Sequence, residues 1–137
     1  MNLSRLRLPS LKFVGIGGIA LAAAACLAPQ AKAEELGGSW TGGGVVTFAD
    51  GHSERAKCRV HYSHSGDSLS LSGICATASG SVEQTAQMRK TGPDSYAGSF
   101  HNEQFGIQGR IHVTVHGNRQ TVSLRSDSGS ASLTLQH

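Results

Sequence analysis

Two cysteines are the side chains of this 137-residue chain whose spacing points most directly to a chemical reaction. Cys58 and Cys75 bracket the stretch CRVHYSHSGDSLSLSGIC, in which apolar and polar residues alternate on both sides of a central turn signal. If this stretch is a β-hairpin, Cys58 faces Cys75 and the two thiols can form a disulfide. The same register places Tyr62 opposite Leu71 and leaves Ser65 to Ser68 as a four-residue turn.

A metal site is the alternative use of the two sulfurs, and the surrounding sequence does not favour it. No second cysteine pair and no suitably spaced histidine accompanies them. His112 and His116 share a strand face, but they lie about 13 Å apart, which is too far to chelate one ion. We therefore predict neither a metal nor a cofactor. The histidines are His52, His61, His64, His101, His112, His116 and His137.

The sequence also lacks a recognisable catalytic pair. Asp50, Asp67, Asp94 and Asp127 lie in turn signals, where aspartate usually accepts hydrogen bonds from the backbone. Serine is abundant, but the G-x-S-x-G nucleophile elbow is missing. No paired carboxylates for glycoside hydrolysis can be named. We therefore predict that the protein is not an enzyme and has no catalytic residue.

One row of cations is the surface feature most suggestive of a function. Arg55, Lys57, Arg59 and His61 alternate along one predicted strand and project from its outward face. Charged strand faces commonly discourage aggregation, and this is the simpler interpretation. The alternative is a contact surface for an anionic partner, either an envelope protein or an anionic glycan.

The first 33 residues have the layout of a secretory signal peptide, which would be removed before folding. Basic residues precede an apolar run over 13–27, and the small residues of Ala31-Lys32-Ala33 precede a cut before Glu34. We therefore predict a signal peptide over 1–33, a single domain over 34–137, and a periplasmic or secreted protein. The alternative is a lipid-anchored protein processed at Cys26, which follows a weak lipoprotein box.

The leader also distorts the charge of the chain, for which the sequence gives a formal value of +3. Arg5, Arg7, Lys12 and Lys32 all lie in it, so the mature domain is close to neutral. The basic isoelectric point is therefore no argument for nucleic-acid binding.

Short alternating segments separated by turn signals fill the rest of the chain, and no stretch keeps a helical period. Eight strands that pair with their sequence neighbours predict an all-β fold, an antiparallel up-and-down barrel, with a two-sheet β-sandwich as the alternative. Its apolar face points inward, so we do not expect the chain to span a membrane. Centring the first turn on Gly51 pairs Val46 with Ala56 and Trp40 with Tyr62. The expected strands include Ser39–Phe48, Glu54–Tyr62, Ser81–Arg89 and Phe105–Val115.

The motif Gly38-Ser39-Trp40 at the start of the first strand resembles the lipocalin and avidin-like barrels, the calycin type. That resemblance implies that Trp40 plugs one end of the barrel, covered by Arg119 or Arg125. The segments GSWTGGG, SERAKCRVHY, CATASG and SLTL are similar to uncharacterised small exported proteins of Gram-negative bacteria. This likeness implies a compact disulfide-bonded barrel and no activity. A weaker likeness is to periplasmic protease-inhibitor barrels, whose second tryptophan this chain lacks.

The inward-facing residues set the expectation for the interior. They include large aromatic side chains, among them Trp40, Phe48 and Phe105, and several glycines. A domain of about 100 residues needs most of its apolar area for stability, so we predict a packed core without a ligand-sized cavity. The expected function is binding or structural, in the cell envelope. The alternatives are a protease-inhibitor-like module and, if the interior is partly empty, a carrier of small apolar ligands.

Overall fold

The computed structural model describes residues 36–137. The predicted signal peptide, its cleavage site before Glu34 and the alternative processing site at Cys26 lie outside the described residues. The eight strands are β1 (Gly38–Phe48), β2 (Ser53–Ser65), β3 (Ser68–Thr77), β4 (Gly80–Gly92), β5 (Ser95–Asn102), β6 (Ile107–His116), β7 (Arg119–Ser126) and β8 (Gly129–Gln136).

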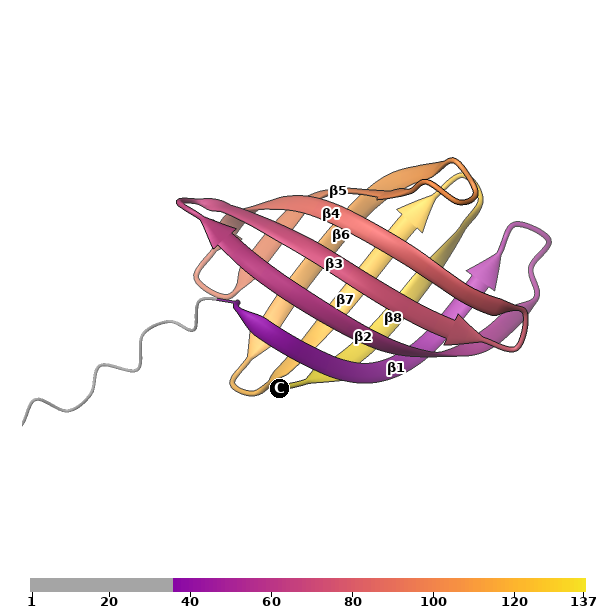
Figure 1. Ribbon diagram of the computed structural model, residues 1–137, viewed down its shortest axis with the longest axis horizontal. Coiled ribbons are helices and arrows are strands. Elements are labelled where there is room, and N and C mark those ends of the chain that lie inside the picture. Colours follow the sequence, from indigo (N-terminus) through magenta and orange to yellow (C-terminus); the bar gives the residue numbers. More distant parts are fainter. Residues whose placement is uncertain (1–35) are drawn as a thin grey trace, which may run out of the picture. The chain divides into compact units, whose positions relative to one another are not determined.

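The strands form a closed barrel in sequence order (Figure 1). Each strand pairs antiparallel with the next, and β1 also pairs with β8, from Thr41 opposite Gln136 to Phe48 opposite Gly129. The predicted all-β, up-and-down barrel is thus confirmed, and the β-sandwich alternative is wrong because the sheet closes on itself. Closure supplies each edge strand with hydrogen-bond partners that a sandwich would leave unpaired.

Alternation along the strands separates an apolar interior from a polar exterior. On β2, Ala56, Cys58, Val60 and Tyr62 are buried, and the residues between them are exposed. This is the period of two that a strand with one face on the core requires. No helix within residues 36–137 is long and apolar enough to cross a bilayer.

The β2–β3 hairpin has the predicted register. Cys58 lies opposite Cys75, and Tyr62 lies opposite Leu71. The turn is shorter than expected, because Ser65 and Ser68 pair with each other and leave only Gly66 and Asp67 between the strands. Gly66 has a φ of 61°, the left-handed conformation that such two-residue turns require.

The predicted β1–β2 register is wrong by two residues. Val46 lies opposite Glu54 rather than Ala56, and Trp40 opposite Val60 rather than Tyr62. The backbone N–H of Phe48 donates to the carbonyl of His52, so the turn is centred one residue earlier than Gly51. Because the shift is even, every side chain keeps its expected face.

Glycines in β1 allow the barrel to close. A Cβ atom added at Gly44 would lie 1.9 Å from the carbonyl oxygen of Ser132, and one at Gly42 would lie 2.1 Å from that of Thr134. Strand β1 therefore passes closer to β8 than any side chain at these positions would permit. Such glycines mark sites where two backbones approach closely at the bend of a barrel.

Candidate functional site: the open end of the barrel

Trp40 is buried near the start of β1, at the end of the barrel that we call the closed end. Its side chain is only 4% exposed, and its indole N–H donates to the carbonyl of Gly37 at 3.1 Å. The ring of His137 meets it edge-on, with the ring centroids 4.9 Å apart. The expected arginine cover is wrong: within residues 36–137 no arginine stacks on this ring, and Arg119 and Arg125 are exposed. The C-terminal histidine occupies the covering position instead.

A buried polar pair lies in the same half of the barrel, near the end of β2 and the start of β7. The hydroxyl of Tyr62 donates to Oε1 of Gln120, and both side chains are almost fully buried. Burial raises the pKa of Tyr62, and the hydrogen bond to Gln120 opposes that shift. The neutral phenol therefore remains a donor at any physiological pH, and the pair is a fixed structural contact.

The opposite end, which we call the open end, contains a cavity of about 520 Å³. The β1–β2, β3–β4, β5–β6 and β7–β8 turns all lie at this end, and residues beside each of them line the cavity. No lysine, arginine, histidine, aspartate or glutamate is among the lining residues. Its apolar wall includes Val46, Val82, Phe100, Ile107, Leu124 and Leu133.

The cavity contradicts the prediction of a core packed throughout. Phe105 was expected to fill the interior from the start of the sixth strand, but β6 begins at Ile107. The side chain of Asn102 accepts a hydrogen bond from the backbone N–H of Phe105 at 3.1 Å, and Gly106 follows with a φ of 63°. Phe105 is consequently held in a turn at the rim and is 60% exposed. Phe105 therefore leaves the interior, and Ala131, an inward position near the mouth, is too small to take its place.

Five residues form the floor of the cavity, since they also border a void of about 20 Å³ further inside the barrel. That void is close to the volume that holds one water molecule. The prediction of a core without a ligand-sized cavity is therefore wrong at the open end. The floor residues are Cys75, Gln84, Phe100, Leu124 and Leu133.

Polar residues at inward positions are the part of this site that the sequence analysis missed. Gln84 lies between Val82 and Ala86 in the inward row of β4, and Asn102 ends β5 as a buried residue. Their signal in the sequence is a polar amide at a position where the alternation calls for an apolar residue. Buried amides need partners, so such interruptions often mark a turn contact or a ligand contact.

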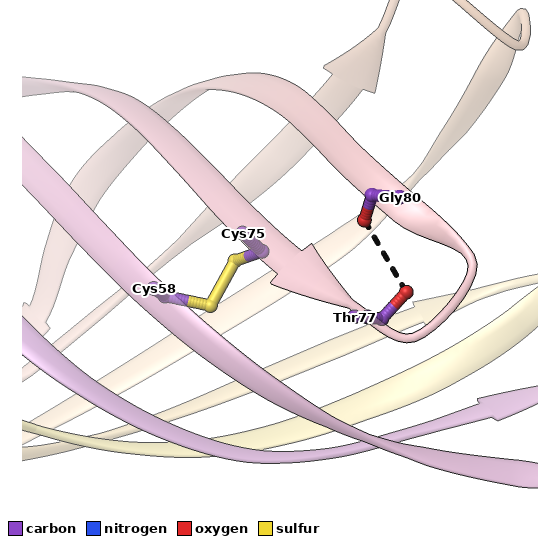
Figure 2. Close-up of a disulfide and its surroundings, with 4 residues drawn as sticks. All are labelled: Cys58, Cys75, Thr77 and Gly80. Carbon is purple, nitrogen blue, oxygen red and sulfur yellow. Dashed lines mark hydrogen bonds between the residues drawn. A yellow bond between two sulfur atoms is a disulfide. The ribbon is translucent and has the colours of Figure 1, made fainter.

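The predicted disulfide is present between Cys58 and Cys75, with the sulfurs 2.02 Å apart. Figure 2 shows that it joins β2 and β3 close to the β3–β4 turn, where the Thr77 hydroxyl donates to the carbonyl of Gly80 at 3.3 Å. Cys75 is also one of the residues that form the floor of the cavity. The bond therefore links a residue of the cavity floor on β3 to the neighbouring strand β2.

A hydrogen-bonded cluster joins two turns at the rim. The imidazole of His52 contacts Oδ1 of Asp50 at 2.5 Å and Oε2 of Glu54 at 3.0 Å. Glu54 in turn accepts from the backbone N–H and the hydroxyl of Ser79, at 2.9 and 2.7 Å. The His52 ring stacks on Phe48, which lines the cavity. We call Asp50, His52, Glu54 and Ser79 the rim cluster.

Hydrogen bonds within the rim cluster shift the pKa values of its members. Hydrogen bonds from Ser79 and His52 lower the pKa of Glu54 to about 2. Hydrogen bonds to Glu54 and Asp50 raise the pKa of His52 above its ordinary value. The Ser79 hydroxyl donates to a carboxylate and makes no hydrogen bond to the imidazole. The cluster therefore lacks the nucleophile–base contact of a serine hydrolase, and it acts as a tie between turns.

The cationic row lies on the outer face of β2, the position that the alternation of the sequence predicts. Arg55, Lys57, Arg59 and His61 are all exposed and line a shallow outer concavity over β1, β2 and β3. The residues opposite them in β1 are Val45, Gly43, Thr41 and Ser39, and those opposite the last three in β3 are Ala76, Ile74 and Ser72. No carboxylate within residues 36–137 makes an ion pair with this row.

Comparison with known proteins identifies the fold of the chain but not a family. No family model matches the chain, and no curated protein matches it. Solved structures that do match include the redesigned β-barrel mFAP1 bound to DFHBI, with a TM-score of 0.63 and 17% identity over 74% of this chain and 94% of that one. The redesigned barrel b11L5F_LGL has a TM-score of 0.59 and 16% identity, and covers 74% of this chain and 90% of that one. The chain thus has the fold of a closed eight-stranded barrel.

Proposed function

We propose that this protein is a binding protein that holds a small, neutral, apolar molecule in the open end of its barrel. The observation that carries the proposal is the cavity of about 520 Å³, which has an apolar wall. That volume is in the range of ligand pockets, roughly 300–1,000 Å³. The lining residues carry no charge, and an unpaired ion is costly to bury, so a neutral ligand is favoured over a fatty-acid anion.

The rim has features suited to a mouth that admits a ligand. Phe105 is exposed beside the opening and offers an apolar surface, while the rim cluster holds the neighbouring turns in place. The similar redesigned barrel mFAP1 is described as bound to DFHBI, a use of this fold that agrees with the proposal. A carrier of small apolar ligands, the alternative expected from the sequence, thus fits the cavity better than a packed core does.

Titration with a neutral fluorescent probe, N-phenyl-1-naphthylamine, tests the proposal. We expect one molecule to bind per barrel and to raise the melting temperature, because a ligand that binds only the folded state stabilises it. Ala131→Trp should abolish binding by filling the cavity, whereas Ser132→Trp, which faces outward on the same strand, should leave binding intact. A protein that does not bind the probe, or a filled variant that binds it equally well, would refute the function.

We also propose that the protein is exported to the periplasm or secreted, as a non-enzymatic component of the cell envelope. The leader-like residues 1–33 and the disulfide support this location, because disulfides persist in oxidising compartments. The resemblance of the sequence to small exported proteins of Gram-negative bacteria agrees with it. Fractionation of the native host, with the mature protein found in the cytoplasm, would contradict the proposal.

A second candidate function is binding of an anionic glycan on the outer face of β2. The supporting observation is that the row of Arg55, Lys57, Arg59 and His61 faces only neutral residues on both neighbouring strands. Unpaired cations at regular strand spacing suit an extended polyanion. Exposed Val45 and Ile74 give the same face apolar area, since their side chains are 45% and 49% exposed.

Retention on an immobilised sulfated polysaccharide tests this second candidate. The double variant Lys57→Glu, Arg59→Glu should elute at much lower salt than the wild type, because each change replaces attraction to the sulfates by repulsion and less salt then screens what remains. The control is Arg89→Glu, Lys90→Glu, which makes the same charge change at exposed positions of β4. Equal elution of the two variants would show that net charge alone determines retention.

A further inference from the structure

We infer that the ligand of the open end carries a hydrogen-bond donor at its buried end, a hydroxyl or an N–H, which reaches Oε1 of Gln84. This inference rests on the proposed binding function and narrows the class of ligand. The inference is based on the position of one side-chain amide, that of Gln84, at the floor of the cavity. Gln84 lines both the cavity and the small void beneath it, so its side chain lies where the ligand would end.

The carbonyl oxygen of Gln84 is buried and accepts no hydrogen bond from any residue of the 36–137 region. Buried amide oxygens in folded proteins almost always have a partner, because leaving one unpaired costs free energy. Opposite Gln84 on β3 lies Gly73, which has no side chain to offer a donor. The acceptor is thus left without a partner beside the floor of the cavity.

The other two inward amides show that this carbonyl is unusual. Oδ1 of Asn102 accepts from the backbone of Phe105, and Oε1 of Gln120 accepts from Tyr62. The Nε2 of Gln120 is also unpartnered, but Gln120 is fully buried and does not line the cavity. Among these three amides, only Gln84 combines an unpaired carbonyl oxygen with a side chain that lines the cavity.

The chemical class of the ligand follows from the unpaired acceptor of Gln84 and from the uncharged wall of the cavity. A carboxylate would be repelled by the carbonyl oxygen and would find no cation among the lining residues. An alkane or arene would bind in the apolar wall but leave the acceptor unpaired. A neutral alcohol, phenol or amide N–H on an apolar skeleton meets both requirements, since it pairs the acceptor and buries apolar area.

Three ligands with one skeleton test the inference: 2-naphthol, naphthalene and 2-naphthoate. We expect the wild type to bind 2-naphthol about five- to tenfold more tightly than naphthalene, the effect of one net hydrogen bond, and to bind 2-naphthoate most weakly. Gln84→Met removes the acceptor at similar volume and should bind the first two equally. Gln87→Met, on the outward face of the same strand, should keep the wild-type preference.

A measurement without ligand gives an independent readout. Because Gln84→Met removes an unpaired buried polar atom, its melting temperature should rise relative to the wild type, and far-UV circular dichroism would confirm the fold. Equal binding of 2-naphthol and naphthalene to the wild type would overturn the inference and leave the proposed function standing. So would a preference for 2-naphthol that survives in Gln84→Met. Failure of all three ligands to bind would refute both.

Discussion

At the scale of single residues, His52 ties the β1–β2 turn to the rim through two carboxylates. Its raised pKa means that its stabilising contribution is fully present below the pKa of an unfolded histidine, about 6.5, and is lost as the pH rises through the folded value. The lowered pKa of Glu54 has the opposite consequence. Its stabilising contribution is fully present above pH 4.5, its ordinary pKa, and is lost as the pH falls towards about 2. The rim cluster is therefore strongest between these limits.

We accordingly predict that His52→Gln lowers the melting temperature most between about pH 4.5 and 6.5, and that the difference from wild type shrinks as the pH rises above that range. Thermal unfolding across this pH range would measure it. His112→Gln, at an exposed position on β6 opposite Ala97 and Ser123, is the control for removing a surface imidazole outside the rim cluster. A destabilisation by His52→Gln that is independent of pH would contradict the charge assignment.

Trp40 is the residue on which packing of the closed end depends. Because it is 4% exposed and hydrogen-bonded through its indole, Trp40→Ala should lower the free energy of unfolding by about 3–5 kcal/mol. Urea denaturation followed by circular dichroism would measure the loss. Lys57→Ala, on the outer face of β2, should change stability by no more than about 0.5 kcal/mol. A loss below about 1 kcal/mol for Trp40→Ala would mean that the plug is dispensable.

At the scale of the elements, close contact between β1 and β8 makes the glycines of β1 indispensable. We predict that Gly44→Ala lowers the free energy of unfolding by about 3 kcal/mol or more, because its Cβ would meet backbone atoms that cannot move without separating the strands. Gly73→Ala is the matched control: its Cβ would lie 3.2 Å from Cγ2 of Val60, a side-chain atom that can adjust. Similar losses in the two variants, measured in urea, would contradict this account of closure.

The two hairpins at the start of the barrel show how far the sequence could predict register. In β2–β3, the cysteine pair and the apolar alternation each demanded Cys58 opposite Cys75, so the register was predictable. In β1–β2, the stretch Gly42 to Gly44 has no side chains to restrict pairing, and a shift of two residues preserves every face. The turn around Gly51 had to determine the register alone, and its length depends on backbone hydrogen bonds that alternation does not encode.

The cavity could not be predicted from the sequence, for a related reason. The alternation correctly identified inward residues such as Tyr62 and Phe100, but a list of inward residues does not give the volume that they enclose. That volume depends on closure between β1 and β8 and on the turn that places Phe105 at the rim. Both are long-range or turn-specific contacts. Gln84 could have been noticed as a polar interruption, although its partnerless carbonyl required coordinates.

At the scale of the whole molecule, maturation should give a chain that begins at Glu34 and contains one disulfide. The small residues before the expected cut and the Cys58–Cys75 bond motivate this prediction. Intact mass of the protein purified from the native host would measure both properties. A diacylglycerol adduct on Cys26 would contradict the cut, and two alkylatable thiols without reductant would contradict the bond.

Pairing of β1 with β8 joins the first and last strands of the barrel, from Thr41 opposite Gln136 to Phe48 opposite Gly129. The other strand pairs are hairpins between sequence neighbours and can form by closing short loops. The rate of folding should therefore be limited by this one distant pairing, because a long loop must be ordered before its contacts form. Until it forms, β1 and β8 both present free backbone edges, and the unfinished barrel is the species most prone to associate with another chain.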